Sequence, residues 1–216
     1  MVLLFQYGEK ELDYLKSKDK KLGELIDHVG YLEIPVDEDV FSSVVRHIIG
    51  QQISMAAQNT IWNRLKEKLG KISPEKILSL SREELQSIGI TFKKADYILN
   101  FAQQIYEESF SMAALHEMSD EEVIKELSKI EGIGPWTAEM IMTFSMQRSD
   151  ILSYGDLAIL RGMRMLYRHR KIDKAKFERY RKRYSPYGSI ASFYLWELAE
   201  GDFPEVIDPG IKRVKK

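Results

Sequence analysis

The sequence of 216 residues predicts an all-α protein. Apolar residues recur with the three- and four-residue spacing of amphipathic helices along most of the chain, and the strict alternation that marks strands is almost absent. Serine, threonine, proline and glycine stand where helices begin and end. We therefore expect eight to ten short helices joined by tight turns, without a long linker, a low-complexity segment or a repeat of fixed period.

The expected helices are marked in order by their ends. Apolar residues with helical spacing fill 41–49 and 53–69, and Gly50 and Ser54 predict a break between these runs, with Gly70 ending the second. A serine followed three residues later by glutamate predicts a capping box, and a proline directly after a serine suits the first turn of a helix. Further helix starts are predicted at Ser73, Ser81, Thr91, Ser119, Pro135, Asp156, Asp173 and Ser185.

The composition excludes several classes of site. The chain has no cysteine, so disulfides, thiolate metal sites, iron–sulfur clusters and cysteine nucleophiles are ruled out together. The four histidines are scattered without the spacing of metal ligands, and we expect no transition metal. No apolar run is long enough for a membrane span, and the N-terminal stretch does not resemble a secretory signal. We therefore expect a cytoplasmic protein that does not contact membranes.

Charge is distributed unevenly, although the formal net charge is only −1. Residues 161–184 carry eleven Lys or Arg against two acids, and the tail 212–216 adds four more bases. Residues 1–40, in contrast, hold ten acids and five bases. A single basic segment on a neutral protein is typical of one anion-binding face. A solvated helix rich in arginine and lysine would give the same pattern.

The segment 127–138, with the sequence LSKIEGIGPWTA, has the pattern of a helix–hairpin–helix. A helix ends near Ile130, two glycines make the turn, and Pro135 begins a new helix. The backbone N–H groups at the start of that second helix form an anion site, which would hold a DNA phosphate without reading its sequence. The apolar residues Leu127, Ile130 and Ile133 favour this motif over an ordinary turn between two helices.

With this motif, the chain resembles the helix–hairpin–helix DNA glycosylase superfamily, and in particular its inducible bacterial 3-methyladenine branch. Four segments carry the resemblance in order: IIGQQIS at 48–54, GIGPWTA at 132–138, GDLAILR at 155–161 and PYGSIASFYLW at 186–196. Together they span roughly residues 40–200. The resemblance implies a monofunctional glycosylase of base excision repair, which flips a damaged base out of double-stranded DNA and hydrolyses its N-glycosidic bond.

The resemblance makes Asp156 the catalytic carboxylate, because the family places an aspartate 22 residues beyond the second hairpin glycine, here Gly134. The residue types agree with this role. Asp156 begins a predicted helix, whose N-terminus favours the ionised carboxylate. Cleavage of an N-glycosidic bond builds positive charge on the sugar, which a fixed carboxylate stabilises while it orients the attacking water. Without the hairpin upstream, a simple helix N-cap would be the better interpretation.

The family also fills the gap left by an extruded base, using a side chain from the turn after its first motif. That position falls on Gln52, with Gln51 beside it, whereas the family branch uses an apolar wedge. A buried hydrogen bond between helices is the alternative for this glutamine pair. The resemblance assigns further DNA contacts to Gly132, Ile133, Gly134, Thr137 and Arg161.

By the same resemblance, Trp136 and Tyr187 line the base pocket, and their ring faces suit cationic alkylated purines. Two other pocket positions, aromatic in the family branch, fall on Met140 and Leu157. In bifunctional relatives a lysine occupies the position of Trp136 and forms a Schiff base with the sugar. Tryptophan cannot do so, and water should therefore be the nucleophile. Helical spacing alone would also allow Trp136 to be a core residue.

The resemblance finally implies two helical domains that flank a DNA-binding cleft. We expect a central barrel over 36–135, and a second domain formed by 1–35 together with 136–216. No cofactor is expected beyond a monovalent cation, Na⁺ or K⁺, held by the carbonyls of Ser128 and Ile130, and we expect the protein to be a monomer. Two other interpretations stay open: a non-catalytic helix–hairpin–helix module that binds DNA or senses damage, and a glycosylase for another damaged or mismatched base.

Overall fold

The computed structural model describes residues 3–37, 39–201, 203 and 206–210, so the basic tail 212–216 lies outside the described residues. In the described part every regular element is helical, apart from one isolated antiparallel bridge between Leu4 and Pro35. The predicted all-α class is confirmed. Among the same residues, none of the helices combines the length and the hydrophobicity needed to cross a bilayer.

The chain divides into two compact units. We call Asp37–Met146 the central unit, and Met1–Val36 together with Gln147–Lys216 the split unit. The first boundary lies within one residue of the expected one. The second lies after helix α9 (Pro135–Phe144), whereas the expected boundary fell at the start of this helix.

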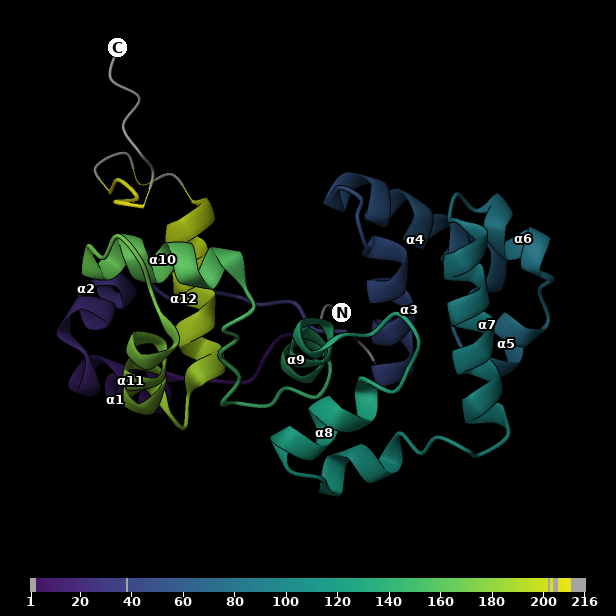
Figure 1. Ribbon diagram of the computed structural model, residues 1–216, viewed down its shortest axis with the longest axis horizontal. Helices are drawn as coiled ribbons and strands as arrows, with labels where there is room; N and C mark the ends of the chain where they lie inside the picture. The colour runs from purple at the N-terminus through teal and green to yellow at the C-terminus, as the bar shows by residue number, and fades with distance from the viewer. Residues whose placement is uncertain (1–2, 38, 202, 204–205, 211–216) are drawn as a thin grey trace, which may run out of the picture. The chain divides into compact units, whose positions relative to one another are not determined.

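The central unit is built around α3 (Val40–Gly50), which packs against α4, α7 and α9. The ring of Phe41 on α3 stacks on that of Phe101 on α7, with 5.3 Å between the ring centroids. The remaining elements of this unit are α4 (Met55–Leu69), α5 (Pro74–Leu78), α6 (Arg82–Ser87), α7 (Phe92–Tyr106), a 3-10 helix (Ala113–Glu117) and α8 (Asp120–Leu127) (Figure 1).

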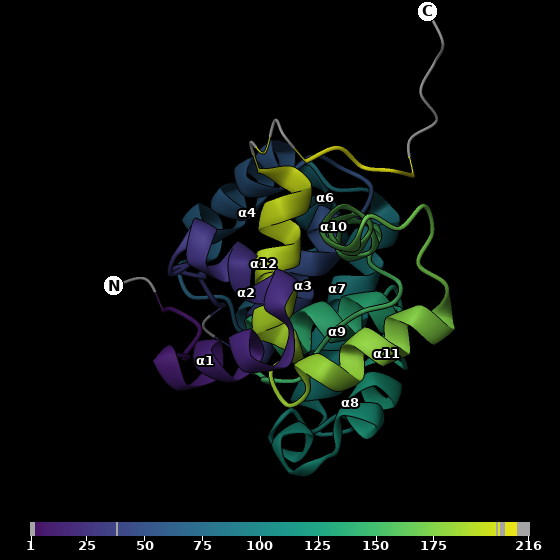
Figure 2. The same cartoon turned by 90° about the vertical axis from the view of Figure 1, so that its left-hand side faces the viewer.

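The split unit is organised around α12 (Gly188–Glu200), which contacts its four other helices (Figure 2). These are α1 (Glu9–Lys18), α2 (Lys20–Val29), α10 (Leu157–Tyr167) and α11 (Lys174–Tyr184). Helices α10 and α12 cross very closely at Gly162, where an added Cβ would lie 2.2 Å from the carbonyl oxygen of Leu195. Only glycine allows the two backbones this separation.

Most predicted helix ends are confirmed, but the start predicted at Ser185 is wrong, because Ser185 ends α11 and α12 begins at Gly188. Ser54 caps α4 and Gly70 ends it, Thr91 caps α7, and Ser81 and Ser119 both form capping boxes. Ser73 occupies the N-cap position of α5 as predicted, but its side chain makes no capping hydrogen bond.

The expected number of helices is too low, because the described residues form twelve α-helices. The difference includes α1 and α2 at the start of the chain. A single residue, Asp19, ends α1 and caps α2 through hydrogen bonds from the backbone N–H groups of Lys21 and Leu22. No glycine or proline separates the two helices, so the turn signals on which the prediction relied are missing there.

Candidate functional site

The predicted hairpin lies between α8 and α9 in the central unit. Leu127, Ile130 and Ile133 are buried and fix its apolar side. Gly132 has φ +87°, and an added Cβ there would lie 2.6 Å from Cδ2 of Tyr97 on α7. Glycine is therefore required at 132 both by the backbone conformation and by the ring packed behind the turn.

The second hairpin glycine has a different environment. Gly134 is the N-cap of α9 and supplies no side-chain cap, and Pro135 occupies the first turn. An added Cβ at Gly134 would meet no neighbouring atom within 4 Å in the part of the chain that the structure describes. Thr137 is buried, whereas Trp136 is 46% exposed. The first turn of α9 thus combines an open approach with the positive end of a helix dipole, which is the arrangement that binds an anionic oxygen.

The turn after α3 is tied to the hairpin within the same unit. The side-chain amide of Gln51 donates a hydrogen bond of 2.5 Å to the carbonyl oxygen of Gly132. Gln52 is exposed and has φ +58°, a left-handed conformation that non-glycine residues seldom adopt. Ile53 and Met55 beside it are also exposed. The structure therefore separates the two glutamines: half-buried Gln51 connects the turn to the hairpin, and Gln52 is exposed.

Lys94 on α7 holds this turn, a role that the sequence analysis missed. Its ammonium group donates to the carbonyl oxygens of Ile49, at 2.8 Å, and of Gln51, at 2.6 Å. Burial lowers the pKa of the Lys94 ammonium group below its ordinary value. These bonds satisfy carbonyls that the end of α3 would otherwise leave without partners. No pattern in the sequence connects residue 94 with this turn.

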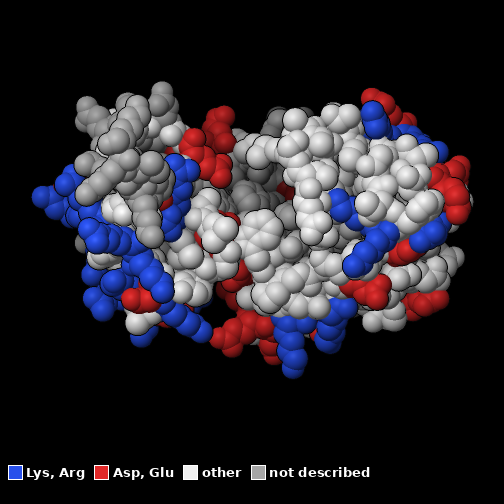
Figure 3. Space-filling view, turned by 45° about the horizontal axis from the view of Figure 1, so that its top comes forward, with Lys and Arg blue, Asp and Glu red and all other residues white. Residues whose placement is uncertain are grey.

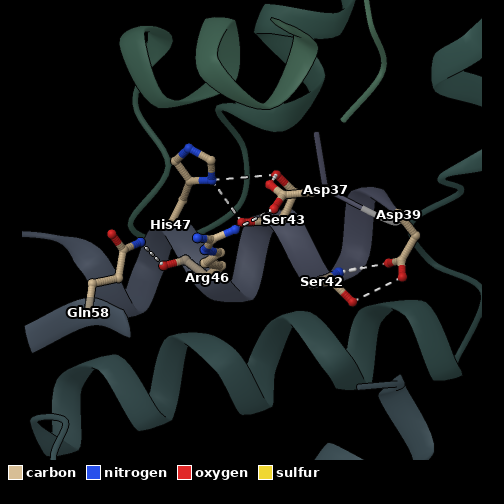
Figure 4. A network of polar contacts seen from close by, with 7 residues as sticks. All are labelled: Asp37, Asp39, Ser42, Ser43, Arg46, His47 and Gln58. Carbon is tan, nitrogen blue, oxygen red and sulfur yellow. Dashed lines mark hydrogen bonds and ion pairs between the residues drawn. The ribbon is translucent and has the colours of Figure 1, made fainter. Parts of the chain in front are cut away.

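A polar network supports the rest of α3 (Figure 4). Asp37 accepts hydrogen bonds from the hydroxyl of Ser43, at 2.7 Å, and from the guanidinium of Arg46, at 2.9 Å. His47 bonds through Nδ1 to the carbonyl oxygen of Ser43, and burial lowers the pKa of its ring. The side-chain amide of Gln58 on α4 donates to the carbonyl oxygen of Arg46. The helix that presents the turn is thus held by hydrogen bonds to Asp37, which precedes it, and from Gln58 on α4.

In the split unit, Asp156 is the N-cap of α10 and is only 6% exposed. Its Oδ1 accepts hydrogen bonds of 2.9 Å from the backbone N–H groups of Ala158 and Ile159. The indole Nε1 of Trp196 on α12 donates to the same oxygen at 3.2 Å. Three donors and the helix dipole stabilise the negative charge and fix the carboxylate in one orientation. Trp196 belongs to the fourth sequence motif, but its bond to Asp156 was not anticipated.

The other predicted side chains have contrasting environments within their own units. Leu157, the first residue of α10, is 81% exposed, and Arg161 one turn later is also exposed. Tyr187 is half-buried at the start of α12, and its ring meets that of Tyr14 edge-on, with 5.2 Å between centroids. Met140 is buried in the central unit.

Candidate ligands for a metal ion do not cluster. Among the residues that the structure describes, no group of three or more His, Asp or Glu side chains could hold a metal ion. In the hairpin, Ile130 offers its carbonyl oxygen to the N–H of Ile133 at 3.0 Å, and the hydroxyl oxygen of Ser128 is buried without a hydrogen-bond partner.

Comparison with known proteins gives the family. Residues 45–186, about two thirds of the chain, match the model described as HhH-GPD superfamily base excision DNA repair protein. The chain belongs to this superfamily. The HhH-GPD fold extends over nearly its whole length, as a solved DNA-3-methyladenine glycosidase of Bacillus halodurans superposes with a TM-score of 0.82 at 32% identity, covering 94% of each chain.

Two further relatives extend the comparison. The 3-methyladenine DNA glycosylase of Schizosaccharomyces pombe, solved in complex with abasic DNA, gives a TM-score of 0.73 at 28% identity, over 87% of this chain and 95% of its own. A Bacillus subtilis relative is 28% identical over 186 residues, 81% of this chain, and this HhH-GPD chain spans 63% of its length.

Proposed function

We propose that this HhH-GPD protein is a monofunctional DNA glycosylase that acts as a monomer in the cytoplasm. It would extrude an alkylated purine of the 3-methyladenine type from double-stranded DNA and hydrolyse the N-glycosidic bond. The observation that carries the proposal is the buried carboxylate of Asp156 at the start of α10, which accepts hydrogen bonds from Ala158, Ile159 and Trp196. Membership of a base excision repair family and the names of the relatives support it.

In the proposed reaction, Asp156 stabilises the positive charge that develops on the deoxyribose as the bond to the base breaks. The base leaves with the bonding electron pair, and a water molecule oriented by the carboxylate adds to the sugar and gives a proton to the carboxylate. A cationic 3-methyladenine leaves as a neutral base, so the step needs no general acid. The hydrogen bonds to Oδ1 hold the charge in place before the reaction begins, which lowers the cost of reorganisation in the transition state.

The proposal gives the turn and the hairpin separate tasks on the DNA. Gln52, with the exposed Ile53 beside it, would fill the gap that the extruded nucleotide leaves in the stack. The start of α9, from Gly132 to Thr137, would hold a backbone phosphate, and Arg161 and the basic segment 161–184 would add phosphate contacts. A monovalent cation at the carbonyls of Ser128 and Ile130 would assist the hairpin, and the unpartnered hydroxyl of Ser128 is compatible with such an ion.

Trp136 and Tyr187 would stack on the extruded base, and Met140 and Leu157 would complete its surroundings. Aromatic faces attract cationic purines more strongly than neutral ones, which favours alkylated substrates. Because Trp136 stands where a lyase would need a lysine, no covalent enzyme–sugar intermediate forms, and the product is an intact abasic site.

The test is base release from a panel of duplexes that carry methylated, deaminated and oxidised bases, followed by analysis of the DNA strand. We expect preferential release of 3-methyladenine, strand breakage only after added alkali, and no adduct trapped by borohydride. Preferential release of uracil or oxidised guanine would replace the substrate assignment. A trapped adduct would contradict the monofunctional mechanism, and no release of any base would favour a non-catalytic DNA-binding module.

A further inference from the structure

Lys and Arg side chains gather on the split unit, on the part of the molecule where Figure 1 draws α10 and α11 (Figure 3). Within this unit, a shallow groove of about 330 Å³ is lined by the junction of α1 and α2, the end of α10 and one face of α11. We propose that this groove is a second anion site, which binds a phosphate group through Lys18, Lys20, Lys21 and Arg183. It is separate from the hairpin, which belongs to the central unit.

The groove contains one carboxylate, and that carboxylate is already neutralised. Asp19 is only 5% exposed. Its Oδ2 accepts a hydrogen bond of 2.9 Å from the guanidinium of Arg183, and its Oδ1 accepts from the backbone N–H groups of Lys21 and Leu22, both at 3.1 Å. Because these bonds compensate the charge of Asp19, it cannot also balance the three lysines at the rim.

The three lysines have weak partners within the described part of the chain. The ammonium group of Lys20 lies 3.8 Å from Glu24, and both side chains are largely exposed, so this pair contributes little. The other two ammonium groups lie over aromatic rings, Lys18 over Tyr14 at 5.2 Å and Lys21 over Tyr167 at 5.9 Å from the centroids. The groove therefore concentrates positive charge that the fold itself does not balance.

The same positive charges act on a histidine in the groove. His169 follows the end of α10, and its Nε2 lies 2.8 Å from the hydroxyl of Tyr180. Burial lowers the pKa of the His169 ring, and the charges of Lys176, Lys21 and Arg179 lower it further, while Asp173 acts in the opposite direction. The net effect of the surrounding charges is to disfavour another cation, which is the condition that attracts an anion.

Phosphate is the anion that matches these donors. It carries more than one oxygen able to accept hydrogen bonds, and ammonium and guanidinium groups are its usual partners in proteins. The groove is open on one side, so the phosphate could be inorganic, could belong to a free nucleotide, or could be one link of a DNA backbone. All three share the chemistry that the groove recognises, and experiment can separate them.

The test follows the His169 ring resonances by NMR, in the full-length protein, while inorganic phosphate is added at constant ionic strength against chloride. We expect the resonances to shift saturably with phosphate and the pKa of His169 to rise, because a bound anion favours the imidazolium form. The double variant K20Q/K21Q should bind phosphate at least fivefold more weakly. As the control, K66Q/K71Q removes the same charge from exposed lysines of the central unit and should leave the affinity unchanged.

These outcomes test the anion site alone, because none of the measurements depends on base excision. Identical responses to phosphate and chloride would overturn it, and so would equal phosphate affinity of K20Q/K21Q and wild-type protein. If a short undamaged duplex moves the His169 resonances as phosphate does, and K20Q/K21Q weakens this response, the physiological ligand is a DNA backbone phosphate. If phosphate binds and the duplex leaves His169 unchanged, the groove serves a free phosphate or nucleotide.

Discussion

The starts of α9 and α10, one in each unit, differ in which negative group can contact the positive end of the helix dipole. At the start of α9, Gly134 supplies no side chain, and the space around its Cα is open. At the start of α10, Asp156 caps the helix itself, with its carboxylate bound to the N–H groups of Ala158 and Ile159. The first arrangement leaves the positive end of the helix to an external anion. The second uses it to hold an internal one.

In the proposed function, the open start of α9 contacts the phosphates of DNA, and the capped start of α10 holds the carboxylate. A carboxylate without hydrogen-bond donors near phosphates would be destabilised by their negative charge and would repel the DNA. Asp156 is buried and receives a third hydrogen bond from Trp196, so its charge is stabilised by the protein rather than by water. The glycine-bounded start of α9 carries no such charge and is suited to contact phosphate directly.

The largest effect is expected from D156N, which removes the carboxylate charge at the start of α10. The amide keeps the shape and an oxygen that accepts the capping bonds, so the melting temperature should change little. Loss of the negative charge should raise the barrier to base release by about 3 kcal/mol or more, on the order of a hundredfold in rate, while affinity for DNA holds or improves. Single-turnover base release, equilibrium binding and a thermal melt measure the three quantities.

The matched control for D156N is D173N. Asp173 is the N-cap of α11 and accepts a hydrogen bond of 2.8 Å from the backbone N–H of Lys176. Its substitution removes the same charge from the same kind of position and should leave the rate unchanged. If D156N melts normally and excises at the wild-type rate, Asp156 is only a cap, and its catalytic assignment must be withdrawn.

The next largest effect is expected from G134L, which places a side chain in the open approach to α9. Among the described residues, none obstructs the first carbon of that side chain, so folding should be preserved. Losing the contact with a backbone phosphate should weaken binding by roughly tenfold, about the value of one hydrogen bond to a charged group. Fluorescence anisotropy with damaged and undamaged duplexes should show equal losses. A loss confined to damaged DNA would mean that the hairpin is not a phosphate clamp.

The smallest effect, of a few fold, is expected from K94M. Removing the ammonium group frees the carbonyls of Ile49 and Gln51 and loosens the turn that carries Gln52, which should slow base extrusion more than it weakens binding. Stopped-flow fluorescence of 2-aminopurine beside the lesion measures extrusion. K93M, at the exposed neighbouring position, is the control. Equal rates for K94M and K93M would show that the turn keeps its geometry without Lys94.

Features encoded by neighbouring residues were predictable from sequence. Caps such as Thr91 and Ser119, the two hairpin glycines and the helix start at Asp156 all depend on residues within one turn. The contacts that hold the candidate site join residues far apart in the chain. Trp196 reaches Asp156 across forty positions, and Lys94 reaches the turn after α3 across more than forty. A spacing pattern carries no information about such pairs, so only the folded structure reveals them.

The discontinuity of the split unit has a consequence for how the protein is made on the ribosome. The central unit is one continuous stretch, Asp37–Met146, and all its residues are available before the second part of the split unit is synthesised. The leucines that α1 and α2 bury, including Leu15 and Leu22, belong to a unit whose organising helix, α12, is synthesised only after the whole central unit. The nascent chain must therefore carry α1 and α2 without their partner α12 while the central unit folds. Chaperone binding during translation should concentrate on α1 and α2, and translational pausing after residue 146 would lengthen their exposure.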